Sequence, residues 1–270
     1  MSVSKLTIGC SRAGSLGNPV PIGEIRAMWQ AAVEAGVRAF DTADIYAQGD
    51  SERHLGRLLR ANPGRGIEVV TKAGFRHGRK ADLVRLLKPV LRPLMRLKGA
   101  GEAVRQVRAE IDNQDFSPAF LSANVDGSRA RLGLGALPGF ILHDPEAAVL
   151  QRPEVGAFLR ALKSEGRVHR TGVSLKDAAA LPAALALDGL DILQMSASAW
   201  ETVRSEALAQ EIRARGIRLY LRQVLNREDG MRRSLKRALR DALDDPAVHS
   251  VILGLSRRKN LDTALAILSK

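Results

Sequence analysis

Four side chains that can take part in acid–base chemistry stand at or just after the ends of short apolar runs in this chain of 270 residues. They are Asp41, Lys72 and His143, with the phenol of Tyr46 shortly after the aspartate. Lysine is costly to bury unless it is paired with an opposite charge, and Asp41 is the expected partner of Lys72. An acid, an amine, a phenol and an imidazole brought together would be suited to moving protons.

Two of these residues also permit other interpretations. Lys72 at the end of a strand could act as the nucleophile of a Schiff-base aldolase. Pairing with Asp41 would keep the ammonium group protonated, which makes it a poor nucleophile and favours the acid–base interpretation. His143 taken alone would be a histidine of the core, and it becomes a candidate for the site because of the other three.

The elements that would position these residues repeat one pattern: a short apolar run, a turn, and a segment with the apolar spacing of a helix. Eight runs are predicted as strands: 6–10, 39–43, 68–73, 139–143, 170–174, 192–197, 218–221 and 251–255. Eight strands alternating with helices predict a parallel α/β sheet that closes into a (β/α)8 TIM barrel. An open doubly wound sheet usually carries a G-x-G-x-x-G turn after its first strand, and residues 9–17 lack one.

A helix is expected after each run. The helix that follows Tyr46 should be capped by Asp50 or Ser51. The alanine-rich segment 176–187 and the segment 203–215 are each predicted to be one continuous helix.

The chemistry of a (β/α)8 barrel lies at the carboxyl ends of its strands. Asp41, Lys72 and His143 lie at the ends of the second, third and fourth predicted strands, and Tyr46 lies in the loop after the second. All four side chains should therefore meet on one side of the barrel mouth.

A longer motif surrounds Asp41. It reads Phe40-Asp41-Thr42-Ala43, two further residues and Tyr46, followed by Ser51-Glu52, two residues and Leu55-Gly56. This ordered spacing, with Lys72 and His143 further along, resembles the signature of the aldo-keto reductases. The resemblance extends over nearly the whole chain.

The resemblance implies NAD(P)H-dependent reduction of an aldehyde or ketone to an alcohol, with Tyr46 as the proton donor. A phenol, with an ordinary pKa of about 10, is a poor acid–base group at neutral pH, and Lys72 would lower that pKa. Asp41 would hold Lys72 charged and in place. A neutral His143 would donate a hydrogen bond that orients the substrate carbonyl.

The resemblance also implies a cofactor site, with NADP (NADPH) as the expected cofactor and NAD left open. Ser174 and Gln194 fall where the family binds the nicotinamide carboxamide, and Arg222 falls where many members stack an aromatic ring. The residues expected at the adenosine-phosphate end are Gly254, Ser256, Arg257 and Arg258. Ser256, Arg257 and Arg258 could donate hydrogen bonds to a 2′-phosphate at a helix start, or they could form a solvated first turn.

Some positions depart from the family pattern. Leu175 replaces an asparagine that usually follows the serine, Thr263-Ala264 replaces a Glu-Asn pair that contacts adenine, and Gly254 aligns with a phosphate-binding lysine. The physiological substrate and the direction of the reaction are therefore left open.

The net charge of +13 is concentrated in one segment, residues 76–108, where ten Lys or Arg residues face only Asp82 and Glu102. No aromatic residue follows Phe75 in this segment to stack on bases, so nucleic-acid binding is not expected. We predict a single barrel domain of residues 1–270 with a basic insertion at about 76–116 after the third strand. Its leucines should pack on the barrel rim, and its outward arginines should attract anionic ligands.

Composition also bears on location and partners. No apolar run of roughly 18 residues is present, the first five residues do not resemble a signal peptide, and the single cysteine, Cys10, suits a reducing compartment. The chain is therefore expected to be a cytoplasmic enzyme without a metal or a membrane partner, acting on a small-molecule carbonyl substrate. The alternative is a cofactor-binding barrel of the same family with a regulatory or partner-docking role. The oligomeric state is not predicted.

Overall fold

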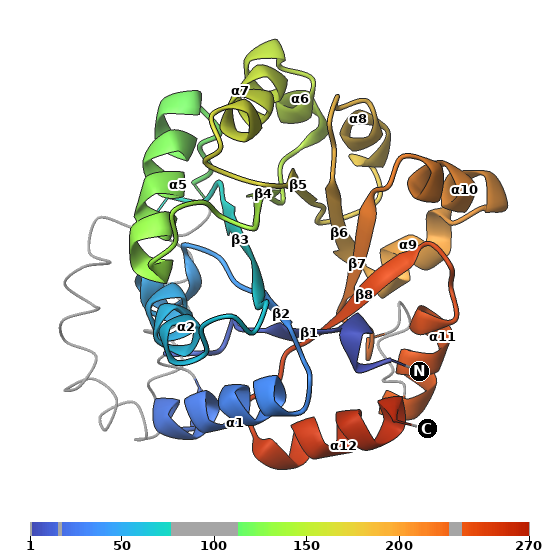
Figure 1. Cartoon of the computed structure of the whole chain (residues 1–270). Coiled ribbons are helices and arrows are strands. Elements are labelled where there is room, and N and C mark those ends of the chain that lie inside the picture. The colour runs from blue at the N-terminus through green and yellow to red at the C-terminus, as the bar shows by residue number, and fades with distance from the viewer. Residues whose placement is uncertain (1, 16–17, 77–112, 227–233, 270) are drawn as a thin grey trace, which may run out of the picture.

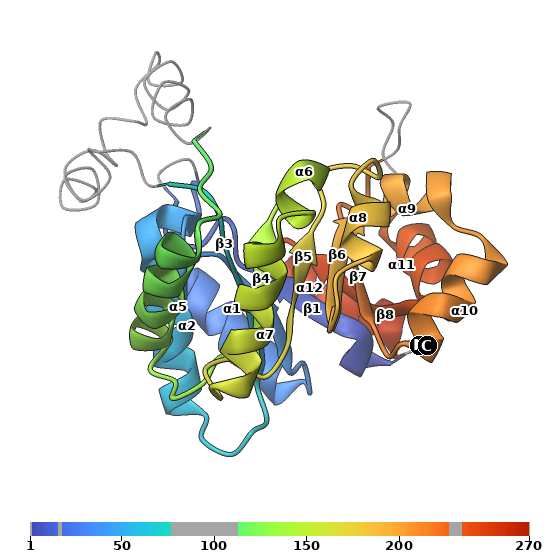
Figure 2. The same ribbon diagram turned by 90° about the horizontal axis from the view of Figure 1, so that it is seen from above.

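The computed structural model describes residues 2–15, 18–76, 113–226 and 234–269. These residues form a closed barrel of parallel strands in the order β1 to β8, with β8 pairing back to β1. Helices form an outer ring around the strands (Figure 1), and a view turned by 90° shows the same arrangement from above (Figure 2). The predicted (β/α)8 fold is confirmed.

The strands agree closely with the predicted runs. They are β1 (Leu6–Gly9), β2 (Ala39–Asp41), β3 (Glu68–Ala73), β4 (Gly139–His143), β5 (Thr171–Ser174), β6 (Ile192–Ser196), β7 (Arg218–Arg222) and β8 (Val248–Leu253). The largest difference is at β8, which was expected to begin at Val251. Its first residues pair with β7 across a register irregularity. They include the polar His249 and Ser250, so this part of the strand does not form an apolar run.

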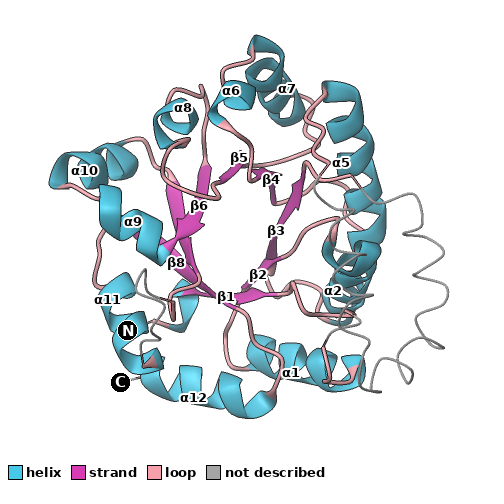
Figure 3. Ribbon diagram, turned by 180° about the vertical axis from the view of Figure 1, so that it is seen from behind, coloured by secondary structure: helices cyan, strands magenta, loops and turns pink. Residues whose placement is uncertain are grey.

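The helices cover the outside of the barrel (Figure 3). The longer ones are α1 (Ile22–Glu34), α2 (Asp50–Ala61), α5 (Pro118–Leu132), α7 (Pro153–Ser164), α10 (Glu206–Ala214), α11 (Leu235–Leu243) and α12 (Arg258–Leu268). Short helices lie beside them: α6 (Ala147–Leu150), α8 (Leu181–Leu185), α9 (Ala197–Val203), and the 3₁₀ turns η1 (Val3–Lys5) and η2 (Tyr46–Gly49).

Two predicted helices are shorter than expected. The prediction for 176–187 is wrong over its first part, because α8 begins only at Leu181. Pro182 then lies in the first turn of α8, where its missing N–H costs nothing. The predicted helix 203–215 is divided at Arg204, whose backbone is extended, and Ser205 caps α10 through Leu208 N at 3.2 Å.

The predicted cap of α2 is also wrong. The residue before the helix is Gly49, whose φ of 79° is in the left-handed region that glycine adopts without strain. Asp50 is the first helical residue, and no side chain caps the helix. The Ser51 hydroxyl is used instead to join the ends of two strands.

The inside of the barrel is divided into an apolar layer and a polar layer. Successive residues of a strand point to opposite faces, so residues two apart share the barrel interior. Five interior side chains from β3, β4, β6, β7 and β8 pack together: Val70, Ile141, Ile192, Tyr220 and Ile252. Two residues further along four of these strands stand Lys72, His143, Gln194 and Arg222. The apolar layer closes the barrel beneath a polar mouth.

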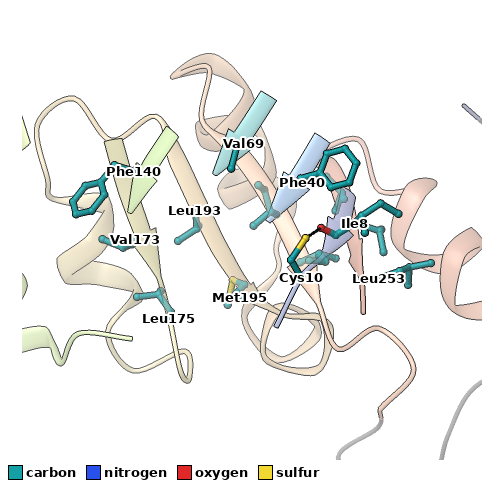
Figure 4. Packing of buried hydrophobic residues seen from close by; sticks show 14 of the residues in the cluster. Ile8, Cys10, Phe40, Val69, Phe140, Val173, Leu175, Leu193, Met195 and Leu253 are labelled. Carbon is teal, nitrogen blue, oxygen red and sulfur yellow. Dashed lines mark hydrogen bonds between the residues drawn. The ribbon is translucent and has the colours of Figure 1, made fainter. Parts of the chain in front are cut away.

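The residues that alternate with these face the helices and form the main core. Phe40, Val69, Phe140, Val173 and Leu193 are buried in this layer, and Figure 4 shows part of it. Burying each such large side chain contributes about 1.5–3 kcal/mol. Gly172 allows β5 to approach β6 closely, because a Cβ atom there would lie 1.9 Å from the carbonyl oxygen of Ile192.

Most of the predicted basic insertion, residues 77–112, lies outside the described residues, so the expectations about its leucines and arginines stay predictions. Its two described ends lie side by side just beyond β3. Phe75 bridges Gln114, and the backbone N–H of Arg76 donates to the Asn113 carbonyl at 2.8 Å. The segment therefore leaves and returns at the carboxyl end of the barrel. Within the described ranges, no helix has both the length and the apolar character needed to cross a membrane.

Candidate active site

A buried ion pair between Asp41 and Lys72 lies at the centre of the barrel mouth. Asp41 ends β2, and Lys72 is on the neighbouring β3. The ammonium Nζ donates to Asp41 Oδ2 at 2.7 Å and to the carbonyl oxygen of Thr42 at 2.8 Å. The side chains are only 2% and 8% exposed, so the interaction is little screened by solvent. The predicted pairing is present in the structure.

The surroundings of Lys72 keep it charged. Burial acts to lower its pKa, but the nearby Asp41 carboxylate and the Tyr46 phenol outweigh burial, and the pKa of Lys72 is raised above its usual value. A permanently protonated lysine is unsuited to Schiff-base formation. It is suited to stabilising negative charge on a neighbouring oxygen.

Tyr46 lies beside this pair in the loop after β2. The Lys72 Nζ is 5.2 Å from the centre of the Tyr46 ring. Burial is the main influence on the pKa of the Tyr46 phenol and raises it; Lys72 acts in the opposite direction, as expected, but does not overcome burial. The effect of Lys72 on the Tyr46 pKa thus has the predicted direction, and burial outweighs it in the net shift.

His143 completes the group from β4. Its imidazole meets the Tyr46 ring edge to face at 5.8 Å and the Phe75 ring at 4.9 Å. Burial, followed by the positive charges of Lys72 and Arg222, holds the pKa of His143 well below its usual value of 6.5. The imidazole is therefore neutral at physiological pH, as its predicted role as a hydrogen-bond donor requires.

The loop that carries Tyr46 is held by a buried carboxyl group. Asp44 Oδ1 accepts a hydrogen bond from the backbone N–H of Ile45 at 2.6 Å, and the Asp44 N–H donates to the Lys72 carbonyl at 3.1 Å. Burial, reinforced by the nearby Glu52, raises the pKa of Asp44 to about 8. Asp44 is therefore largely neutral at pH 7 and adds little charge beneath Tyr46.

The second half of the motif, Ser51 to Gly56, supports the site rather than lining it. The Ser51 hydroxyl donates to the Cys10 carbonyl at 3.1 Å and pairs with the Thr42 hydroxyl at 2.8 Å, which joins the ends of β1 and β2. Gly56 lets α2 approach α5, because a Cβ atom there would lie 2.5 Å from the Arg131 carbonyl oxygen.

Glu52 extends this support to β3. Its buried carboxylate accepts from the Thr71 hydroxyl at 2.6 Å and pairs with Arg131 of α5. Thr71 directly precedes Lys72, so α2 and α5 fix the strand on which this lysine is placed. This explains in physical terms why Ser, Glu and Gly occur at these spacings.

The predicted nicotinamide-binding side chains lie on adjacent strands of the same rim. Gln194 on β6 donates from Nε2 to Asp41 Oδ1 at 2.6 Å. The Ser174 hydroxyl on β5 donates to Asp144 Oδ1 at 2.8 Å. Arg222 on β7 donates from Nη2 to the Leu175 carbonyl at 2.6 Å. Gln194 thus contacts Asp41 directly, whereas Ser174 and Arg222 are held by Asp144 and Leu175, each the next residue after the end of its strand.

Several buried polar atoms at this rim have no hydrogen-bond partner, which bears on whether a nicotinamide fits here. Within the described ranges, His143 Nδ1, Gln194 Oε1 and Arg222 Nε are buried and make no hydrogen bond. Such atoms are unfavourable unless ordered water or a ligand satisfies them. An amide oxygen beside the barrel mouth is suited to accepting a hydrogen bond from a carboxamide NH₂, so these residues fit the nicotinamide end of the cofactor.

The residues predicted for the other end of the cofactor lie between β8 and α12. Gly254 is exposed with open space around its Cα, and Ser256 is buried with Asn18 Nδ2 3.4 Å from its hydroxyl. Arg257 is the exposed residue that precedes α12, which has no side-chain cap. Arg258 is already paired with Asp262 at 2.7 Å, so Arg257 is the better candidate for a phosphate contact.

Three residues of the site were not identified from the sequence. Asp144 contacts Ser174 and Arg222, Phe75 packs on His143, and Gln114 donates to the carbonyl oxygens of His143 and Asp144 at 3.2 and 3.0 Å. Asp144 could have been found, because it directly follows a predicted strand. Gln114 lies on the far side of the basic segment, and no local signal connects it to the site.

The fold and these side chains define a (β/α)8 protein with a buried acid–base group at the carboxyl ends of its strands. The aldo/keto reductase family model matches residues 5–237, and the chain belongs to this family. The resemblance drawn from the motif is confirmed.

Curated relatives are consistent with the family. A D-threo-aldose 1-dehydrogenase of a Pseudomonas species is 30% identical over 73% of this chain and 57% of that protein. A 6-dehydroglucose reductase of Agrobacterium fabrum is 26% identical over 64% of this chain and 50% of that protein. The chain thus spans little more than half the length of these relatives.

Solved structures share the fold over almost the whole chain. An aldo-keto reductase of Bacillus halodurans in its holo form has a TM-score of 0.70 at 20% identity, covering 98% of this chain and 87% of that one. An aldo-keto reductase of Klebsiella pneumoniae in complex with NADPH has a TM-score of 0.69 at 17% identity, covering 98% and 86%. At these identities the likeness concerns the fold.

Proposed function

We propose that this protein is an oxidoreductase that reduces an aldehyde or ketone to an alcohol with a nicotinamide cofactor. The observation that carries the proposal is the contact between a charged Lys72, the Tyr46 phenol and a neutral His143 in one buried mouth. Family membership and the names of the dehydrogenase and reductase relatives support it. Substrates are carbonyl compounds small enough to reach a group built on the buried Asp41–Lys72 pair.

Each side chain has a distinct part in this reaction. The neutral imidazole of His143 donates a hydrogen bond to the substrate carbonyl and orients it. Tyr46 donates its proton to the carbonyl oxygen as negative charge develops there. Lys72 stabilises the resulting phenolate, and Asp41 keeps Lys72 in position through the 2.7 Å ion pair. The bound cofactor would supply the hydride, and Ser174, Gln194 and Arg222 would hold its nicotinamide.

The proposed cofactor is NADPH in preference to NADH. The support is the exposed Arg257 at the start of α12, with Ser256 and Lys259 beside it. A charge-assisted hydrogen bond to the 2′-phosphate contributes about 1.5–3 kcal/mol, enough for roughly tenfold discrimination or more. The K. pneumoniae structure with NADPH shows that cofactor in a protein of the same fold. The proposed location is the cytoplasm, consistent with a single, buried cysteine.

A matched pair of tyrosine variants tests the function, because the described tyrosines lie at opposite ends of the barrel. NADPH oxidation is followed with a panel of aldehydes and ketones for the wild type, Tyr46→Phe and Tyr220→Phe. Tyr46→Phe should lose roughly 10²- to 10⁴-fold in turnover while still binding NADPH, because only the proton donor is removed. Tyr220→Phe should keep most of the activity.

Two outcomes count against the proposal. Retention of carbonyl reduction by Tyr46→Phe would exclude Tyr46 as the proton donor. Tight binding of NADPH by the wild type without turnover of any carbonyl compound would favour the alternative role, a barrel that senses cofactor and docks to a partner. Titration of the wild type with NADPH and NADH in the same buffers measures the cofactor preference.

A further inference from the structure

Asp144 holds an unusual position between the acid–base group and the nicotinamide-binding residues. It follows His143 directly, and its Oδ1 accepts from the Ser174 hydroxyl at 2.8 Å and lies 3.4 Å from Arg222 Nη2. One carboxylate oxygen therefore joins two of the three side chains assigned to the nicotinamide. Its side chain is 22% exposed, at the edge of the mouth.

The backbone of Asp144 is fixed in a conformation that few residues adopt. Its φ of 52° lies in the left-handed region, where aspartate and asparagine are tolerated better than most side chains. The Asp144 N–H donates to the Ser174 carbonyl at 2.9 Å, and the Asp144 carbonyl accepts from Gln114 Nε2 at 3.0 Å. The carboxylate is thus held in place from both sides.

The charges that act on Tyr46 form two pairs. Within the described residues they are Lys72 with Asp41 and Arg222 with Asp144. Two positive and two negative side chains leave the mouth close to neutral. Without the charge of Asp144, the guanidinium of Arg222 would leave a surplus positive charge at the mouth.

That surplus matters because the two redox forms of a nicotinamide differ in charge: the oxidised ring is positive and the reduced ring is neutral. The substrate carbon that exchanges the hydride is bonded to the oxygen that exchanges a proton with Tyr46. Charges that act on Tyr46 therefore also act on a nicotinamide bound next to the same substrate. The carboxylate of Asp144 favours the positive ring, and an unbalanced Arg222 disfavours it.

We propose that Asp144 determines the redox preference of the cofactor site, stabilising the oxidised nicotinamide relative to the reduced one and so favouring hydride transfer to a carbonyl. This inference rests on the proposed function. In this direction the carbonyl carbon would receive a hydride from the reduced cofactor, and the carbonyl oxygen receives the proton of Tyr46, which leaves a phenolate that Lys72 stabilises. The products would be an alcohol, the oxidised cofactor and a deprotonated Tyr46.

Asp144→Asn is a sharp test, because asparagine keeps both the acceptor oxygen for Ser174 and the tolerance of a left-handed backbone, and loses only the charge. Dissociation constants for NADP⁺ and NADPH are measured by calorimetry. Both cofactors carry the same 2′-phosphate, so the ratio of the two constants reports on the nicotinamide end alone. The variant should bind NADP⁺ more weakly relative to NADPH by on the order of tenfold, a modest value because the side chain is partly exposed.

Arg222→Gln and the double variant, which combines it with Asp144→Asn, complete a double-mutant cycle. Removing the positive charge alone should shift the ratio in the opposite direction, toward NADP⁺, and the double variant should return it toward the wild-type value. A merely structural role for Asp144 would weaken both redox forms together. If the ratio is the same in the wild type and in Asp144→Asn, the inference is overturned while the proposed function stands. If the wild type binds neither form, the proposed function and this inference are both overturned.

Discussion

Two clusters of the same kinds of side chain lie at opposite ends of the barrel. The upper cluster is Tyr46, His143, Lys72 and Asp41, and the lower cluster is Tyr220, His249, Arg218 and Glu68. In each, a tyrosine meets a histidine edge to face, at 5.8 Å above and 5.3 Å below. In each, a cation beside the tyrosine pairs with a carboxylate, at 2.7 Å above and 2.8 Å below.

The clusters differ in how far water reaches the ion pair. Lys72 and Asp41 are 2% and 8% exposed, whereas Arg218 and Glu68 are 25% and 47% exposed. The upper cation is also a lysine, a compact charge, whereas arginine stays charged in any environment. Burial lowers the pKa of both histidines, to about 4 for His249 and well below 6.5 for His143.

The clusters also differ in their unsatisfied atoms. His143, Gln194 and Arg222 each leave a buried polar atom without a partner at the upper end, whereas no lower-cluster side chain does so in the described part of the chain. Residue types alone therefore do not make this site. The upper cluster differs from the lower, structural cluster because its ion pair is shielded from solvent and because buried polar atoms beside it have no hydrogen-bond partner.

The largest expected difference between the clusters concerns their cations. Lys72→Met should strand the buried Asp41 carboxylate and cost roughly 3–5 kcal/mol of unfolding free energy, besides abolishing most turnover. Arg218→Met removes a solvated pair and should cost about 1 kcal/mol or less. Urea denaturation of both variants measures these costs. Equal destabilisation by the two substitutions would contradict the distinction between a buried and a solvent-exposed ion pair.

The histidines should differ in turnover rather than stability. His143→Gln should lower kcat by roughly 10²- to 10³-fold, because a positioned donor to the substrate oxygen is weakened. His249→Gln should leave kcat near the wild-type value. Because the pKa of His143 is held well below 6.5, the wild-type rate should not decline near pH 6.5 as the medium is made acidic. A decline centred there, abolished by His143→Gln, would show that this imidazole titrates normally.

The last expected effect is a change of stability with pH, from the carboxyl group of Asp44 in the loop that carries Tyr46. With a pKa raised from 3.8 to about 8, folded Asp44 keeps a proton that the unfolded chain has released, so its contribution to stability is lost as pH rises between these values. Asp44→Asn has no such proton to lose. The variant should therefore gain about 1.4 kcal/mol per pH unit relative to wild type across roughly pH 4 to 8.

Unfolding free energies of the two proteins at several pH values provide the measurement. Asparagine keeps an oxygen that can accept from the Ile45 N–H, so the loop should persist in the variant. A difference between the proteins that stays constant with pH would show that Asp44 is ionised in the folded state.

Much of the fold could be predicted because its signals are local. The strands β3 and β4 follow from apolar runs closed by breakers, and α5 from a serine and a proline at its start. The helix errors have equally local causes. Pro182 was compatible with either the interior of a weak helix or its first turn, and the chain packs so that the turn is the better solution.

The residues that could carry the chemistry were predictable from the amino-acid order. Asp41, Tyr46, Lys72 and His143 were identified because their types and spacing meet at one end of any barrel built from these runs. The parallel register of β2, β3 and β4 then places three of them on adjacent strands. A period of two along each strand decides which side chains point inward.

How the neighbouring groups share their hydrogen bonds and charges depends on the folded barrel. Asp144 meets Ser174 across 30 positions of the chain and Arg222 across 78, and Gln194 meets Asp41 across 153. The net direction of the Tyr46 pKa likewise depends on burial that no local pattern reports. Such contacts depend on barrel closure, which brings distant strand ends within hydrogen-bond distance, and on the side-chain positions that packing then allows.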